Sequence, residues 1–246
     1  MSGHNKWSKI KRKKGVTDAR RSKIFTRILK EITVSVREGT VDSDSNPRLR
    51  LALNNAKGVN LPKDTIQRAI NKASESGGAN FMETTYEGYG PGGIAVFVEC
   101  TTDNINRTVN NMRMHFTKYH GTLGTNGSLA FVFDRKGVFT VQQGTLDADN
   151  FEMAVIDVGS EDVELDEGVF AITTAFEDFG MMNKKLEEMK VEVENAELQR
   201  IPKTTAPVDF DTARRVLRLI ESIEEDDDVQ AVYHNMELTD EIMEAI

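Results

Sequence analysis

The side chains best placed to do chemistry in this sequence are cations gathered near its start. Six of them lie within nine residues and surround the single tryptophan, Trp7: they are Lys6, Lys9, Lys11, Arg12, Lys13 and Lys14. Four more follow shortly after, at Arg20, Arg21, Lys23 and Arg27. Lys and Arg side chains displace counterions from a phosphate backbone, and an aromatic ring stacks on an unpaired base. These eleven residues are the predicted nucleic-acid-binding site.

The charge of the chain is segregated along its length. The net charge is −9, yet residues 1–77 hold 18 Lys and Arg against 7 Asp and Glu, whereas the remainder holds 13 against 33. Such an asymmetry is typical of proteins with a polyanionic partner. The acidic run at 224–228 is interpreted as a solvated turn between a helix and a strand. A bolder hypothesis is that this run binds the basic arm, residues 1–14, as an intramolecular decoy for nucleic acid.

Enzyme signatures are missing from the sequence, and we expect neither a catalytic site nor a cofactor. The four histidines are far apart and lack metal-ligand spacing. The glycine-rich segment 88–93 lacks the Lys-Ser/Thr ending of a phosphate-binding loop and joins two predicted strands. The single cysteine, Cys100, excludes an internal disulfide, and its place at the end of an apolar run predicts a buried thiol.

The sequence also bears on the compartment and the partners. No apolar stretch approaches the roughly 20 residues of a membrane span, and the basic start lacks the apolar segment of a secretory signal. We therefore expect a cytoplasmic protein with no membrane partner. The expected oligomeric state is a monomer.

Three helices are predicted before residue 78. Isoleucine and valine recur every four positions from Ile24 to Val36, which predicts an amphipathic helix over 17–38 with the cations away from its apolar face. Asn46-Pro47 predicts the start of a second helix, and Pro62 the start of a third. Gly77-Gly78 is the predicted domain boundary.

After this boundary the pattern changes to strands. Residues 135–203 follow the order β-α-β-β-α-β of a ferredoxin-like domain. Residues 79–134 follow the order β-β-α-β, with a last strand at 128–134, and need the helix and strand of 204–246 to complete a sandwich. The predicted class is α+β: a basic arm plus three-helix domain (1–78), then two ferredoxin-like α/β domains, with 135–203 inserted within 79–134 and 204–246.

Several blocks of the sequence resemble, in order, those of the YebC/PmpR family. They are the opening MSGHNKWSKIK and the segments 46–50, 86–93, 102–108, 121–128 and 227–235. The resemblance spans nearly the whole chain. It implies three domains, a helical one followed by two α/β domains of which one is inserted in the other.

The resemblance also implies a nucleic-acid partner, bound by the matching arm and first helix. Family members are described as probable transcriptional regulators that bind DNA, while others, mitochondrial relatives included, are translational activators with a role at the ribosome. Two functions stay open: a DNA-binding transcriptional regulator, and a translation factor bound to ribosomal RNA or the ribosome. An unrecognised enzyme is the remote alternative. The blocks 86–93 and 103–108 are interpreted as structural, with an RNA-facing or ligand-facing loop as the alternative.

Overall fold

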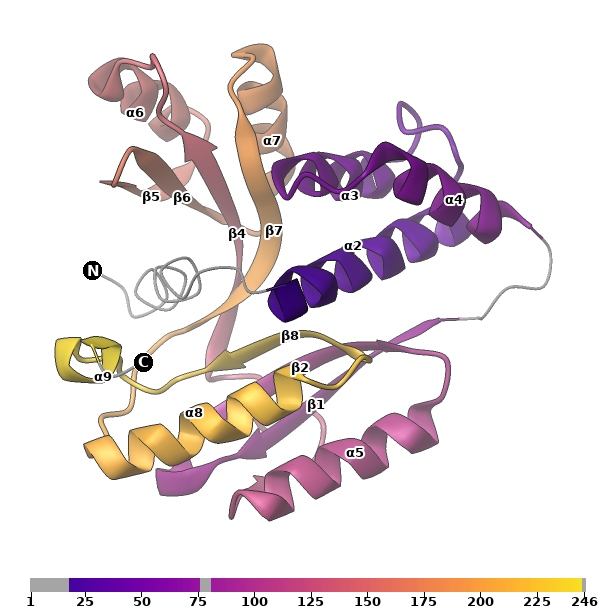
Figure 1. The fold of residues 1–246 in the computed structure, drawn as a ribbon. Coiled ribbons are helices and arrows are strands. Elements are labelled where there is room, and N and C mark those ends of the chain that lie inside the picture. The colour runs from indigo at the N-terminus through magenta and orange to yellow at the C-terminus, as the bar shows by residue number, and fades with distance from the viewer. Residues whose placement is uncertain (1–17, 76–80, 245–246) are drawn as a thin grey trace. The chain divides into compact units, whose positions relative to one another are not determined.

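The computed structural model describes residues 18–75 and 81–244 of the chain (Figure 1). Of these, residues 18–27, 81–134 and 201–244 form a first compact unit, and residues 28–75 and 135–200 form a second. The fold class is the predicted α+β, with helices first and two four-stranded sheets after them. The predicted boundary at Gly77-Gly78 lies outside the described residues, and the division into three domains stays a prediction.

The N-terminal helices begin and end close to where the sequence predicts. Asn46 caps the second helix, because its Oδ1 accepts the Leu49 N–H at 3.0 Å and Pro47 occupies the first turn. The Asn46 side-chain amide also donates to the Ser35 and Thr40 carbonyls, at 2.8 Å each. One buried side chain therefore starts this helix and holds it against the end of the preceding one. The helices are α2 (Asp18–Glu38), α3 (Pro47–Gly58) and α4 (Lys63–Ser74).

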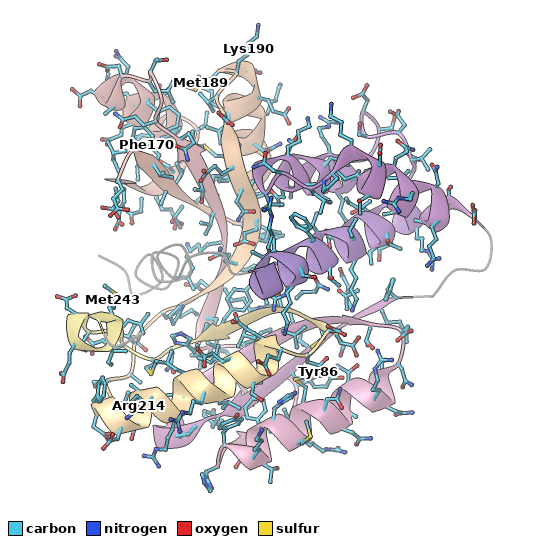
Figure 2. The ribbon with its side chains drawn as sticks, viewed as in Figure 1. Tyr86, Phe170, Met189, Lys190, Arg214 and Met243 are labelled. Carbon is cyan, nitrogen blue, oxygen red and sulfur yellow. The ribbon has the colours of Figure 1, made fainter. Side chains whose placement is uncertain are left out.

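The second unit contains the ferredoxin-like sheet, and the predicted order of its elements is confirmed. The strands lie side by side in the order β5-β6-β4-β7. Alternate residues of β4 and β6 point toward two helices and form one core with them. Phe170 of β6, labelled in Figure 2, belongs to this core, and its ring centroid lies 4.5 Å from that of Phe151. The elements are β4 (Phe133–Gln142), α6 (Ala148–Ile156), β5 (Ser160–Asp166), β6 (Val169–Ala175), α7 (Phe179–Glu188) and β7 (Val193–Pro202).

Helix α3 packs against β7, the edge strand of this sheet. The Asn55 side chain accepts the Ala196 N–H at 3.0 Å and donates to the Ala196 carbonyl at 2.9 Å. A single amide thus pairs with the strand as a neighbouring strand would, and it covers part of an open sheet edge. Leu51 adds an apolar contact between α3 and the core.

We expect Asn55→Ala to lower the free energy of unfolding by about 1.5 kcal/mol, because a buried strand N–H and carbonyl lose their partner. Urea denaturation followed by circular dichroism measures the change. Asn54→Ala is the matched control. Adjacent helical side chains point in different directions, so this control should change the stability by less than about 0.5 kcal/mol. Equal losses in the two variants would contradict the role assigned to Asn55.

The first unit contains the other sheet, in which every strand pair is antiparallel and the order is β3-β1-β2-β8. Figure 1 shows helices α5 and α8 side by side along one face of it. Tyr86 of β1, labelled in Figure 2, lies in the core beneath them. The β2 residues Val96, Val98 and Cys100 are buried in the same core, which confirms the predicted buried thiol. The elements are β1 (Met82–Tyr89), η1 (Pro91–Gly93), β2 (Ala95–Thr102), α5 (Ile105–Lys118), β3 (Thr122–Leu123), α8 (Phe210–Glu224), β8 (Val229–His234) and α9 (Asp240–Glu244).

One part of the strand prediction is wrong. The sequence predicts a strand at 128–134 and a separate one at the start of 135–203, whereas β4 is a single strand over Phe133–Gln142 and residues 128–132 form turns. The turns place Leu129 and Phe133 together against Phe97, on the face of the first sheet opposite α5 and α8. An apolar run is typical of a strand, but here its side chains cover a sheet instead of extending one. The third strand of that sheet is the two-residue β3.

Candidate nucleic-acid interface

The predicted nucleic-acid-binding residues fall into two groups. Residues Lys6, Trp7, Lys9, Lys11, Arg12, Lys13 and Lys14 lie outside the described residues, as does the side chain of Arg20. The side chains of Arg21, Lys23 and Arg27 lie on the first half of α2, within the first unit. The structure gives these three cations two different environments.

Lys23 and Arg27 bind the C-terminal end of helix α8. Lys23 Nζ donates to the Glu225 carbonyl at 3.0 Å, and Arg27 donates to the Glu224 and Val229 carbonyls at 3.1 Å each. The last carbonyls of a helix lack partners within it and carry a partial negative charge, so cations are stabilising there. These two side chains therefore fix the start of α2, the helix that follows the basic arm in the sequence, on the first unit.

Arg21 is exposed instead. Its guanidinium carbon lies 5.5 Å from the centroid of the Phe25 ring. A cation over an aromatic ring at an exposed site gains about 0.5–1 kcal/mol. Among the described members of the predicted site, Arg21 is thus the cation most accessible to a phosphate.

Asp228, in the acidic run, is a buried carboxylate that residues of the block 102–108 bind. Only 5% of its side chain is exposed. The Nη2 atom of Arg107 lies 2.8 Å from both carboxylate oxygens, and these hydrogen bonds raise the pKa of Arg107. The Thr102 and Thr108 hydroxyls donate to Oδ2 at 3.1 Å and 2.9 Å. The carboxylate therefore fastens the first turn of α5 to the residue that precedes β8.

Asp226 is a second buried carboxylate, with 7% of its side chain exposed. Asn111 donates to its Oδ2 at 2.8 Å, and His115 Nε2 lies 3.8 Å from the same oxygen. Burial by itself raises the pKa of Asp226, but His115, the Asp228 N–H and Asn111 outweigh it and bring the pKa down to about 2. The interpretation of the run as a solvated turn is wrong for Asp226 and Asp228, because α5 supplies the donors that allow both to be buried.

This environment also bears on the hypothesis that the acidic run binds the basic arm. The arm lies outside the described residues. The carboxylates of Asp226 and Asp228 are already bound by α5. Neutralising these two residues removes contacts that hold the first unit together, so a change in nucleic-acid binding in such variants would not report on a decoy.

We expect the stability of the protein to fall as the pH is lowered from about 4 to 2, in part through Asp226. Its pKa is about 2 in the folded chain against 3.8 for an ordinary aspartate, so the ionised form is favoured by folding. The stabilisation is present above pH 4 and amounts to about 2 kcal/mol. Urea denaturation at pH 5 and at pH 2.5 measures it. Asp226→Asn should lose less stability between these pH values than the wild type; parallel losses would contradict the assignment.

A serine, a histidine and an aspartate come together at this position, as they do in hydrolytic triads. Ser222 Oγ lies 2.8 Å from His115 Nδ1, and Asp226 lies on the Nε2 side of the same ring. This is the reverse of the catalytic arrangement, in which the serine uses Nε2 and the aspartate Nδ1. All three side chains are buried, so they link α5 to α8 and do not present the hydroxyl to a substrate.

Metal-binding and membrane-spanning features are likewise missing from residues 18–75 and 81–244. In that part of the chain no group of three or more His, Cys, Asp or Glu side chains is placed to hold a metal ion. None of its helices has the length and apolar character needed to cross a bilayer.

Glu87 on β1 is the buried carboxylate that holds the glycine-rich block 121–128, and the residue is 5% exposed. Its Oε1 accepts the Gly127 N–H at 2.8 Å, and its Oε2 accepts the Leu129 N–H at 2.5 Å and the Ser128 hydroxyl at 3.3 Å. The Glu87 carbonyl accepts the Gly124 N–H at 2.7 Å. The blocks 86–93 and 121–128 are therefore joined through one side chain, which supports the structural interpretation of 86–93.

The same two blocks approach each other closely at a glycine. A Cβ atom at Gly88 would lie 2.6 Å from the Thr122 carbonyl oxygen and 2.6 Å from Cε1 of Phe116. Gly92, in the turn between β1 and β2, has a φ of 68°, a conformation that side chains disfavour. The glycines of 88–93 thus serve a tight turn and a close strand contact, as their type predicts.

The fold and the site define a class of protein with a helical, basic N-terminal part followed by two α/β regions. In the first unit, the buried carboxylates of Glu87 and Asp228 bind residues of different sequence blocks. Residues 5–76 match the family model of the TACO1/YebC protein N-terminal domain, and residues 81–236 match that of the TACO1/YebC second and third domain. The chain belongs to the YebC family, and the resemblance seen in the sequence is confirmed.

Relatives of the chain match it over nearly their whole length. A probable transcriptional regulatory protein of Amoebophilus asiaticus is 46% identical over 96% of this chain and 98% of that protein. One of Fusobacterium nucleatum is 45% identical over 100% of both. The crystal structure of a conserved hypothetical protein from Aquifex aeolicus is similar with a TM-score of 0.82 and 41% identity, over 92% of this chain and 93% of that one.

Sequence reasoning missed the residues that organise the first unit. Glu87, Asp226 and Asp228 are distant in sequence from the side chains that they bind, so no spacing pattern links them. One signal was available for Glu87, which is a charged residue in a strand of a well-packed sheet. Such a residue is rarely buried without partners.

Proposed function

We propose that this protein is a cytoplasmic, monomeric regulator of gene expression that binds nucleic acid through its basic arm and the start of α2. The observation that carries the proposal is the segregation of charge: residues 1–30 hold 11 Lys and Arg against Asp18 alone. The names of the relatives, probable transcriptional regulatory proteins, agree with a regulatory role.

The geometry of α2 distinguishes the three of the eleven predicted residues whose side chains the structure describes. Lys23 and Arg27 use their donors on the carbonyls at the end of α8, where they anchor the helix. Arg21 presents its guanidinium at the surface. On this proposal the arm and Arg21 supply the phosphate contacts, and Lys23 and Arg27 act by positioning them.

Fluorescence anisotropy with a labelled duplex DNA over a series of salt concentrations tests the proposal. If roughly six phosphates are neutralised, the slope of log K against log salt should be near −5. Removal of residues 1–14 should weaken binding strongly and bring the slope toward zero, and Arg21→Ala should reduce its magnitude by about 1. Arg27→Ala is the contrasting variant, because it should lower the melting temperature and leave the slope unchanged. A slope near zero for the full chain would overturn the proposal.

A role in translation is the second candidate function, favoured by the same basic arm with its tryptophan on an otherwise acidic chain, which suits insertion into structured RNA. Sedimentation with ribosomes at low and moderate salt separates the two candidates. Co-sedimentation that depends on residues 1–14 would assign the protein to translation. Failure to co-sediment, with sequence-selective binding to duplex DNA retained, would assign it to transcription.

A further inference from the structure

Phe131 is the most exposed large apolar side chain of the described residues, with an exposed fraction of 85%. Single exposed apolar residues are common on protein surfaces and carry no meaning by themselves. The surroundings of Phe131 are unusual, because the turns that hold it are fixed on both sides. Leu129 and Phe133 are buried against the first sheet, so the chain is anchored two residues before and two residues after the exposed ring.

Polar contacts add to this anchoring. The Leu129 N–H is bound by the buried Glu87 carboxylate, and the Val132 carbonyl accepts the Lys203 N–H at 2.9 Å. The Ala130 N–H donates to the Gly127 carbonyl at 3.3 Å. These contacts fix the conformation of the loop 124–132, and the Phe131 side chain is nevertheless exposed.

The residue types of the loop 124–132 indicate which kind of ligand the Phe131 ring contacts. Residues 121–133 contain no charged residue, in a chain of which 29% is charged. Thr125, Asn126 and Ser128 are exposed in the same loop, with hydroxyl and amide groups that both donate and accept hydrogen bonds. The acidic residue that follows, Asp134, is paired with Lys203 at 3.3 Å. A protein-binding aromatic residue is usually surrounded by further apolar contacts. In this loop the exposed side chains at 125, 126 and 128 are small and polar, and the residues that flank the ring are Ala130 and Val132.

We propose that Phe131 stacks on an unpaired nucleobase of a bound single strand, with the polar side chains of 124–128 beside it at the base edge. A flat ring on a loop of fixed conformation, with neutral donors and acceptors in the same loop, suits the face and the edge of a base. This inference rests on the proposed function, since it names the part of a nucleic acid that a second site would recognise. The arm binds phosphates whatever their pairing, and the loop selects bases that are free to stack.

The test uses the full chain and a single-stranded RNA of about 12 nucleotides with 2-aminopurine at its centre, alone and paired with its complement. The wild type should bind the single strand and quench the 2-aminopurine fluorescence. Phe131→Ala should weaken single-strand binding about tenfold and abolish the quenching, with less than about a twofold effect on the duplex. The salt slope should stay unchanged, because no charge is removed.

Two variants and a melting curve keep the test specific. Phe131→Trp should restore the affinity and Phe131→Leu should not, because leucine keeps the apolar character and lacks the flat ring. The melting temperatures of all three variants should match the wild type, since the side chain is exposed.

The outcomes separate the two proposals. Absence of nucleic-acid binding by the wild type would overturn the proposed function and this inference together. Normal binding by the wild type with equal affinity of Phe131→Ala for the single strand would overturn this inference alone, as would an equal loss on the duplex or rescue by leucine. Loss of ribosome co-sedimentation with unchanged single-strand binding would assign Phe131 to a protein partner and overturn it as well.

Discussion

Asp228→Ala is expected to lower the free energy of unfolding by about 3 kcal/mol, because the Arg107 guanidinium and two threonine hydroxyls then lose a shared acceptor. The Thr102 and Thr108 side chains are buried and have no route to solvent in the folded state. Arg107 is 46% exposed and recovers part of its hydration, which keeps the effect below the upper end of the range for buried pairs. Urea denaturation at neutral pH, followed by far-ultraviolet circular dichroism, measures the change.

Asp103→Ala is the matched control for this prediction. Asp103 binds the same guanidinium nitrogen at the same distance, 2.8 Å, but 45% of its side chain is exposed. Exposed ion pairs contribute little, so this control should cost less than about 0.5 kcal/mol. The comparison holds the guanidinium nitrogen and the distance constant, and the two carboxylates differ in burial and in the threonine hydroxyls that Asp228 also binds. Similar losses in both variants would show that the pairing with Arg107, not the buried threonine network, determines the energy.

Glu87→Ala is expected to destabilise the protein by about 2–3 kcal/mol, because the N–H groups of Gly127 and of the buried Leu129 lose the carboxylate that accepts them. Ser128→Ala removes only the long 3.3 Å contact to the same carboxylate and should cost less than about 0.5 kcal/mol. Amide hydrogen exchange locates the effect: faster exchange at residues 124–132 in Glu87→Ala than in the wild type is the expected result. Uniform acceleration over both units would contradict a local role.

The Glu87 prediction also bears on the proposed stacking of Phe131. If the loop loses its fixed conformation, the cost of ordering it is added to the cost of binding. Glu87→Ala should therefore weaken single-strand binding although residue 131 is still phenylalanine. Ser128→Ala keeps the loop fixed and removes one hydroxyl from the proposed base-edge contacts, so it should weaken single-strand binding less than Glu87→Ala does.

Local sequence signals determined most of the secondary structure. Asn46-Pro47 marked the start of α3 because capping depends on residues within one turn. The four-residue apolar spacing marked α2, and the element order of 135–203 predicted the ferredoxin-like sheet. The apolar run at 128–134 was misread, because a short apolar run has the same pattern whether it pairs in a sheet or covers one.

The basic arm, the family and the absence of enzyme signatures could be read from residue types alone, since charge and motif blocks survive in a linear sequence. The tertiary structure decided which charged side chains are buried or bound by distant parts of the chain. Lys23 and Arg27 meet the end of α8 about 200 residues later in the chain, with separations of 202 and 197 residues for two of their hydrogen bonds. Asp228 meets Arg107 across 121 residues. Burial and pairing at such separations depend on how the sheet brings helices together. The donors on α5 are distant in sequence from the acidic run, so the sequence alone predicted a solvated turn there.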